Sequence, residues 1–160
     1  MKIIGGVILL FVALAVSRGY RSFVSDGVKQ AQGFLDLFVG LKTHIRGSGA
    51  PIESYMLGVD IPSLSAVGFF AEYERRKSLS DAFLSVRQGL FVPNGMLDAV
   101  GRVLDLLGRG DISTEVRILD DGIDELKKMI EEYRSASERS VRVVTVTLAA
   151  VSFGLFVILL

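Results

Sequence analysis

Four acidic side chains are the first candidates for chemistry in this sequence. Asp120, Asp121, Asp124 and Glu125 lie within six residues of one another. In a helix, residues four apart share a face, which would pair these carboxylates two by two. Such pairs can bind a hard divalent cation or act as general acid and base in a hydrolase. Lysines follow one turn later, and acids are favoured near a helix start, so we interpret the group as solvated helix surface.

His44 is the only histidine, and the chain has no cysteine. A Ser-His-Asp triad or a zinc site would have to use this histidine without a second histidine or a thiolate beside it. Because the chain has no cysteine, disulfides are excluded. The sequence also contains no glycine-rich phosphate-binding loop of the Walker type. We therefore expect no catalytic residue, no cofactor and no metal, and we interpret His44 as a surface residue at a helix end.

Two short motifs suggest binding. Residues 109–111 spell Arg-Gly-Asp, the tripeptide that integrin adhesion receptors read, although three residues recur often by chance and a turn is the simpler interpretation. Residues 75–77 are Arg-Arg-Lys and follow Phe69, Phe70 and Tyr73, a combination that could contact acidic lipid or RNA. A core stripe closed by a basic helix end explains the same residues. Because 18 basic residues balance 18 acidic ones, we expect no nucleic-acid partner.

Two apolar ends bound the elements that must position these residues. Residues 3–16 and 143–160 contain no charged side chain and flank a charged middle. A spanning helix needs about 20 apolar residues, and the two runs have 14 and 18. We predict an N-terminal transmembrane helix over residues 1–19, a helical domain over 20–139 and a C-terminal transmembrane helix over 140–160.

The N-terminal run also permits a second interpretation. Lys2, the apolar residues 3–12 and the sequence Ala-Leu-Ala at 13–15 fit a signal peptide, which would leave the domain outside the cell on one anchor. Lys and Arg are concentrated on the domain side of both apolar ends, and such an excess stays cytoplasmic. We therefore predict a multi-pass protein of the cell membrane, with two helices and a domain that faces the cytoplasm.

The charged middle is predicted to be an all-α bundle of six helices. Apolar side chains recur every three or four positions, most clearly over residues 116–133. Glycines and prolines divide the predicted helices, which cover residues 18–45, 51–57, 64–77, 81–90 and 96–107, with a last helix running from 116 into the second anchor. Ser63 and Ser80 are the expected N-caps. Gly33 and Gly40, seven residues apart, predict a close neighbour on one face of the first helix.

Several segments together resemble stage III sporulation protein AB of endospore-forming bacteria. Residues 2–5 (KIIG) are similar to the family's K-L-L-G start, and residues 41–46 (LKTHIR) to its L-E-T-E-I segment. Residues 79–83 (LSDAF) look like its L-x-x-A-W helix, and residues 106–111 (LLGRGD) like its L-G-x-S-D turn. The long final helix with an apolar end matches as well, so the resemblance covers the whole chain.

The resemblance implies a fold like that of the inner-membrane platform protein of type II secretion systems. It also implies a non-enzymatic membrane scaffold on the mother cell side of a complex between mother cell and forespore. Its implied partners are other stage III sporulation membrane proteins and a cytoplasmic secretion-type ATPase, which the scaffold would dock; homo-oligomerisation is left open. Two alternatives remain, a small membrane-anchored metal-dependent hydrolase and an outward-facing anchored adhesin. The family-motif positions that could contact a partner are Lys42, Ile45, Arg46, Leu107, Gly108, Arg109 and Asp111.

Overall fold

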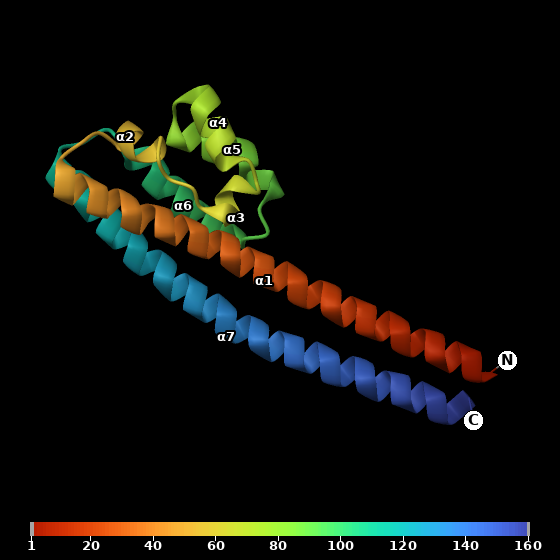
Figure 1. Cartoon of the computed structure of the whole chain (residues 1–160). Coiled ribbons are helices and arrows are strands. Elements are labelled where there is room, and N and C mark those ends of the chain that lie inside the picture. Colours follow the sequence, from red (N-terminus) through yellow and green to blue (C-terminus); the bar gives the residue numbers. More distant parts are fainter. Residues whose placement is uncertain (1, 160) are drawn as a thin grey trace. The chain divides into compact units, whose positions relative to one another are not determined.

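The computed structural model describes the backbone of residues 2–159, which is built of helices joined by short loops (Figure 1). No strand occurs in that range, so the predicted all-α class is confirmed. The elements in chain order are α1 (Lys2–Ser48), α2 (Ile52–Met56), α3 (Pro62–Ser65), α4 (Phe69–Arg76), α5 (Leu79–Val86), the 3-10 turn η1 (Arg87–Gly89), α6 (Asn94–Leu106) and α7 (Ile112–Leu159).

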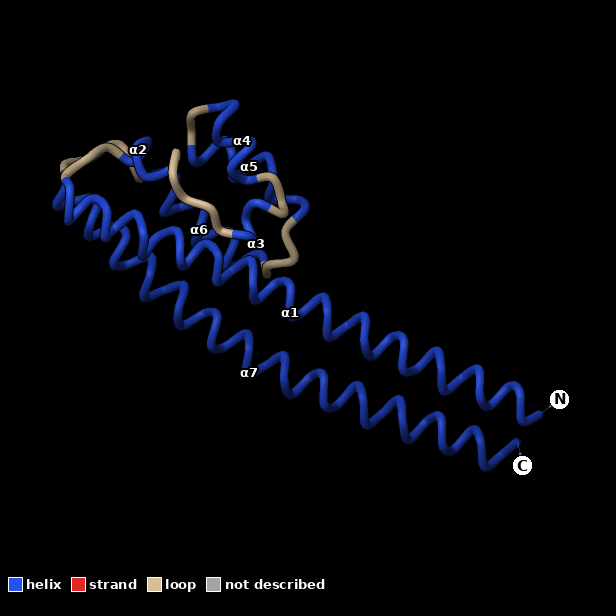
Figure 2. Tube along the Cα trace, in the orientation of Figure 1, coloured by secondary structure: helices blue, strands red, loops and turns tan. Residues whose placement is uncertain are grey.

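The chain folds as two compact units. The core unit is Gly27–Glu131, and the helix-pair unit combines Met1–Asp26 with Glu132–Leu160. Helices α1 and α7 each contribute to both units, whereas all the short helices from α2 to α6 belong to the core unit. Figure 2 shows the loops that join these short helices.

Phenylalanine rings from three helices form the centre of the core unit. Phe34 of α1 meets Phe69 of α4 and Phe83 of α5 edge-on, with ring centroids 5.6 Å apart in both pairs. All three side chains are buried, with at most 1% of their surface exposed. Edge-to-face ring pairs add about 0.5–1.5 kcal/mol to the stabilisation that burial itself gives. This cluster therefore fixes α4 and α5 against α1.

The single helix predicted over residues 64–77 is wrong, because the chain breaks at Gly68 into α3 and α4. Leu64 and Phe69 are both fully buried, yet five residues along one helix would place them about 140° apart. Gly68 adopts a left-handed φ of 80°, which turns the chain and lets both side chains face the core. The expected N-cap Ser63 consequently lies inside α3.

Two other predicted helix ends fall close to those observed. Helix α1 ends at Ser48, three residues after the predicted end at residue 45, and Gly49 follows with a left-handed φ of 61°. Helix α5 starts two residues earlier than predicted, because Ser78 rather than Ser80 is its N-cap. The Ser78 Oγ accepts a hydrogen bond of 3.3 Å from the backbone N–H of Asp81.

The predicted close neighbours of the two α1 glycines are confirmed. A Cβ added at Gly33 would overlap the Ser63 hydroxyl of α3, and one added at Gly40 would overlap the Tyr55 hydroxyl of α2. Both glycines therefore allow short helices to lie directly on the α1 backbone. Side chains of ordinary size at these positions would force α2 and α3 outward.

The predicted membrane topology disagrees with the helices that the structure describes. Over the part of the chain that the structure describes, none of the helices combines the length and apolar composition that crossing a bilayer requires. The prediction of a multi-pass membrane protein with two spanning helices is therefore wrong, whereas the domain bounds at residues 1–19, 20–139 and 140–160 stay a prediction. Most side chains of residues 1–17 and 148–160 lie outside the described part.

Candidate functional site

Two segments that carry the family resemblance meet at one end of the core unit. Residues 42–46 form the last turns of α1, and residues 107–111 connect α6 to α7. Gly49, just after α1, lies beside Ile112 at the start of α7, since a Cβ on Gly49 would be 3.8 Å from the Ile112 Cδ1 atom. Segments more than sixty residues apart in the sequence are thus brought together here.

On the α1 side of this end, the three family-motif residues have different surroundings. Lys42 forms an ion pair with Asp120 of α7, and both side chains are partly exposed. Ile45 is buried, with 2% of its surface exposed, whereas Arg46 is exposed to solvent. Arg46 is therefore the one of these residues whose charge is presented outward.

On the other side, residues 107–109 make a tight connection after α6. Leu107 is buried, and Gly108 adopts a φ of 80°, a conformation that favours glycine. The Gly108 N–H donates to the Glu115 carboxylate over 3.1 Å, and the Arg109 guanidinium donates to the Asp105 carboxylate over 2.9 Å. The loop is therefore held from both neighbouring helices.

Asp111 caps the N-terminus of α7. Its carboxylate accepts hydrogen bonds from the Thr114 N–H at 3.3 Å and from the Ser113 hydroxyl at 2.5 Å. These hydrogen bonds, with that of Ser113 contributing most, lower the pKa of Asp111 to about 2. The Arg-Gly-Asp tripeptide is thus a turn with a helix cap, as the simpler interpretation of the sequence predicted.

A pocket of about 230 Å³ opens beside this loop. Its walls come from α2, from the connection between α4 and α5, and from the end of α6. Mixed charge and hydroxyl groups line it, notably Glu53, Tyr73, Lys77, Ser80, Asp105 and Arg109. Leu107 and Gly108 contribute to the same wall as Arg109. Three family-motif positions therefore lie in one pocket.

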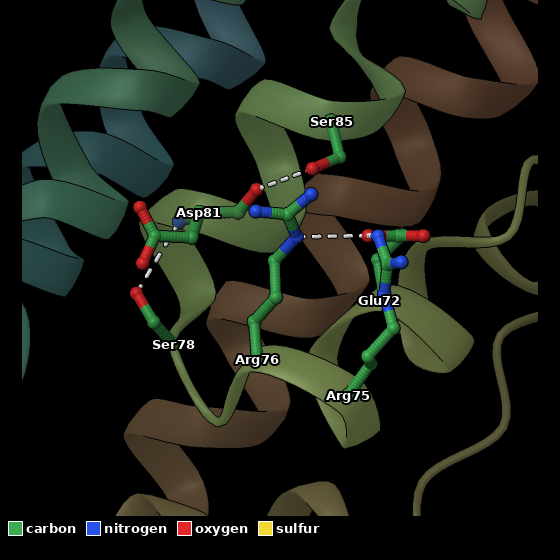
Figure 3. A network of polar contacts seen from close by, with 6 residues as sticks. All are labelled: Glu72, Arg75, Arg76, Ser78, Asp81 and Ser85. Carbon is green, nitrogen blue, oxygen red and sulfur yellow. Dashed lines mark hydrogen bonds and ion pairs between the residues drawn. The ribbon is translucent and has the colours of Figure 1, made fainter.

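Hydrogen bonds hold the connection between α4 and α5 together. Figure 3 shows this connection. The Ser78 hydroxyl oxygen accepts a hydrogen bond from the Asp81 N–H, and the Glu72 carboxylate accepts hydrogen bonds from Arg75 and Arg76. The two arginines donate to one Glu72 oxygen, at 2.6 and 2.9 Å, and lower the pKa of that carboxyl, with Arg76 contributing most. The basic residues after the aromatic stripe therefore end a helix, as predicted.

Tyr73 of α4 also lines the pocket. Only 5% of its surface is exposed, so the ring belongs to the core. Burial, with a smaller contribution from the Glu53 carboxylate, raises the pKa of its phenol. The hydroxyl therefore stays protonated and available as a donor at neutral pH. Sequence reasoning assigned Tyr73 to the core and missed its place in the pocket.

The four acidic residues at 120–125 do not form a cation site in the described part of the chain. Asp120 pairs with Lys42 on α1, and Glu125 accepts a hydrogen bond of 2.8 Å from Arg102 on α6. Asp121 and Asp124 are exposed on α7. Two of the four carboxylates therefore tie α7 to its neighbours.

His44 links α1 to α2 and is only partly exposed. Its Nε2 lies 2.8 Å from the Ser54 hydroxyl oxygen, and that hydroxyl donates to the Pro51 carbonyl over 2.7 Å. Since the serine has one hydrogen to give, His44 Nε2 must be the donor in their contact. The ring also packs against Tyr55, with ring centroids 5.5 Å apart. The interpretation of His44 as a mere surface residue missed this tether.

The chain matches no family model, no curated protein and no solved structure. The resemblance to stage III sporulation protein AB therefore stays a prediction. What the described residues establish is a helical core unit with a pocket that residues 79–80 and 107–109 of the family-like segments help to line.

Proposed function

We propose that this chain is a non-enzymatic docking subunit whose core unit binds a protein partner at the end that holds the pocket. The resemblance identifies the partner to be tested first as the secretion-type ATPase of a stage III sporulation complex. Other stage III sporulation proteins are further candidates. The proposed function requires no cofactor.

One observation carries the proposal. Three large apolar side chains within four residues in sequence of the pocket lining are strongly exposed: Leu57 at 76%, Leu106 at 49% and Ile112 at 52%. Large exposed apolar side chains gathered around polar groups are typical of surfaces that bind another protein. Leu57 follows α2, Leu106 ends α6 and Ile112 starts α7.

The charged groups at this end support docking because they are already held in place. Arg109 is tied to Asp105, Lys42 to Asp120, and Asp111 to the first turn of α7. A surface whose side chains are fixed before binding loses less conformational entropy when a partner arrives.

The proposal is tested by co-purification of the full-length chain with the secretion-type ATPase. Leu106→Ser combined with Ile112→Ser should abolish recovery of the complex while the helical content of the chain is retained. Leu84→Ser is the matched control, because Leu84 is 57% exposed but lies in a different groove, between α5 and α6. Equal recovery of the ATPase by all three proteins, or no recovery by the unmodified chain, would overturn the proposal.

A further inference from the structure

We propose that Asn94, at the start of α6, is a site of spontaneous chemical modification. The Gly95 backbone nitrogen attacks the side-chain amide, and the residue becomes aspartate or isoaspartate. This inference goes beyond the proposed docking function, because Asn94 lines the groove between α5 and α6 and not the pocket beside residues 107–109. The residue types, the position at a helix start and the exposure of the side chain support it.

Asn94 is the one asparagine of the chain, and a glycine follows it. Glycine has no Cβ, so nothing shields its backbone nitrogen from the side chain of the preceding residue. The Asn94 side chain is exposed, so water reaches its amide. Gln88 also precedes a glycine, but its longer side chain would have to close a six-membered ring, which forms more slowly than a five-membered one.

Helix α6 does not hold the Gly95 N–H. The helix begins at Asn94, and the N-cap residue Pro93 has no side-chain acceptor. The Pro93 carbonyl accepts the N–H groups of Met96 and Leu97 at 3.0 and 3.1 Å. The N–H of Gly95 comes too early in the helix to have an acceptor within it. Ring closure requires Asn94 to leave the helical conformation, and helix ends open at a small cost in free energy.

Two aspartate–glycine pairs in the chain show why this position matters. Asp26-Gly27 and Asp121-Gly122 could close a ring of the same size, but they lie inside α1 and α7. Within a helix, the glycine N–H donates to the carbonyl four residues earlier. A carboxylate is also a poorer electrophile than a carboxamide. Among the residues that the structure describes, Asn94 and Gly95 are therefore the pair best placed to react.

The reaction needs only water. The Gly95 nitrogen loses its proton and bonds to the Asn94 Cγ atom, the Cγ–Nδ2 bond breaks, and the amide group takes up a proton and leaves as ammonia. Water then opens the cyclic imide. Cleavage of the new Cγ–N bond leaves aspartate, whereas cleavage of the bond to the main-chain carbonyl carbon leaves isoaspartate. The net change is asparagine plus water to an acid plus ammonia.

The products change the charge at the start of α6. The first turn of this helix contains no acidic residue, and the helix dipole favours a negative charge there. The groove that Asn94 lines, of about 430 Å³, also contains Arg87, which is paired with Asp98. Aspartate therefore adds a negative charge to the groove and keeps the helix, whereas isoaspartate adds a methylene group to the backbone and disturbs its first turn.

The test is storage of the full-length protein at pH 7 and at pH 9, followed by mass spectrometry of the intact chain and its peptides. We expect the mass gain of an amide replaced by an acid, located at Asn94, with isoaspartate among the products. The gain should be faster at pH 9, because the attacking nitrogen must lose its proton. If the folded chain keeps the amide while the same chain in urea loses it, the start of α6 protects Asn94 and the inference is overturned.

Gly95→Ala locates the reaction. Its added Cβ would lie 3.4 Å from the Met129 Cε atom, an ordinary contact, so the fold should be retained. Alanine shields the nitrogen and favours the helix, so conversion should slow about fivefold or more. Equal rates in this variant and the unmodified chain would overturn the inference.

Gly89→Ala is the matched control, because nothing lies within 4 Å of its added Cβ and it follows Gln88 rather than Asn94. It should leave the conversion unchanged. A mass gain located at Gln88 and suppressed by Gly89→Ala, with none at Asn94, would overturn the inference. These measurements need no partner, so their outcome is independent of whether the ATPase is captured.

Discussion

Lys42 of α1 and Asp120 of α7 form an ion pair that joins the first and last helices of the core unit. The Lys42 side chain is 27% exposed and the Asp120 side chain 44% exposed, so water screens the pair only in part. The pair also links Lys42, a family-motif position, to one of the four acidic residues of α7. The Asp120 carboxylate therefore helps to hold α7 against α1.

Breaking this pair should destabilise the core unit slightly. Partly exposed ion pairs are worth about 0.2–1 kcal/mol, so we expect Lys42→Met to lower the free energy of unfolding by an amount in that range. The measurement is a double-mutant cycle with Asp120→Asn in urea. A coupling energy near zero at low salt would contradict the prediction, as would a coupling that does not weaken when salt is added.

Phe34 should be far more sensitive than any surface residue. It is fully buried and contacts both Phe69 and Phe83 through its ring. Phe34→Ala should cost about 3–5 kcal/mol, because it leaves a cavity at the point where α4 and α5 meet α1. Phe34→Leu should cost less, since leucine fills most of that volume. Urea unfolding followed by circular dichroism measures both values, and equal losses in the two variants would argue against a cavity.

Local signals in the sequence predicted much of the fold. The glycines and proline around residues 47–51 ended α1 within three residues of the predicted end, and the period of apolar residues in the last helix identified its buried side. The break at Gly68 was missed because the segment has the composition of one helix. The spacing of five between Leu64 and Phe69, both buried, was the available signal. It points to a turn only if both side chains are known to face the same core.

The candidate site could not be predicted from the sequence in the same way. Its pocket combines Glu53, Tyr73 and Arg109 from three separate helices or loops, and no local pattern specifies that they meet. Tyr73 illustrates the difficulty, because its place in an aromatic stripe correctly predicted burial of the ring. Only the packing of α4 against its neighbours decides where the hydroxyl emerges.

Gly122 permits α7 to lie close to α6. A Cβ at this position would be 2.5 Å from a Val103 methyl group, and valine has no flexible chain with which to move away. We expect Gly122→Ala to destabilise the core unit by about 1–3 kcal/mol through overpacking, reduced by the gain of up to about 1 kcal/mol in helix propensity.

Gly47→Ala is the matched control for this prediction. Gly47 also lies in a helix, but nothing is within 4 Å of its added Cβ. Alanine there should stabilise α1 by up to about 1 kcal/mol. Urea midpoints that move in opposite directions for the two variants would confirm the close approach. A stabilising effect of both substitutions would show that α6 and α7 have room between them.

Asp111 should give the core unit a specific dependence on pH. Hydrogen bonds from Ser113 and Thr114 lower its pKa from 3.8 to about 2 in the folded protein. A carboxyl with a lowered pKa stabilises the folded state fully at pH values above its unfolded pKa. As the pH falls from 3.8, the unfolded chain binds the proton first, so this contribution declines and is lost as the pH falls through about 2.

The measurement is the free energy of unfolding of the full-length chain and of Asp111→Asn between pH 2 and pH 6. Asparagine caps helices about as well as aspartate but does not titrate in this range, so it isolates the protonation effect. The unmodified chain should be the more stable of the two at pH 6, and the difference should shrink as the pH falls below 4. Asp111→Ala, which removes the cap, should be less stable than Asp111→Asn at every pH. A difference between aspartate and asparagine that stays constant over this range would mean that the Ser113 and Thr114 hydrogen bonds do not hold the carboxylate in solution.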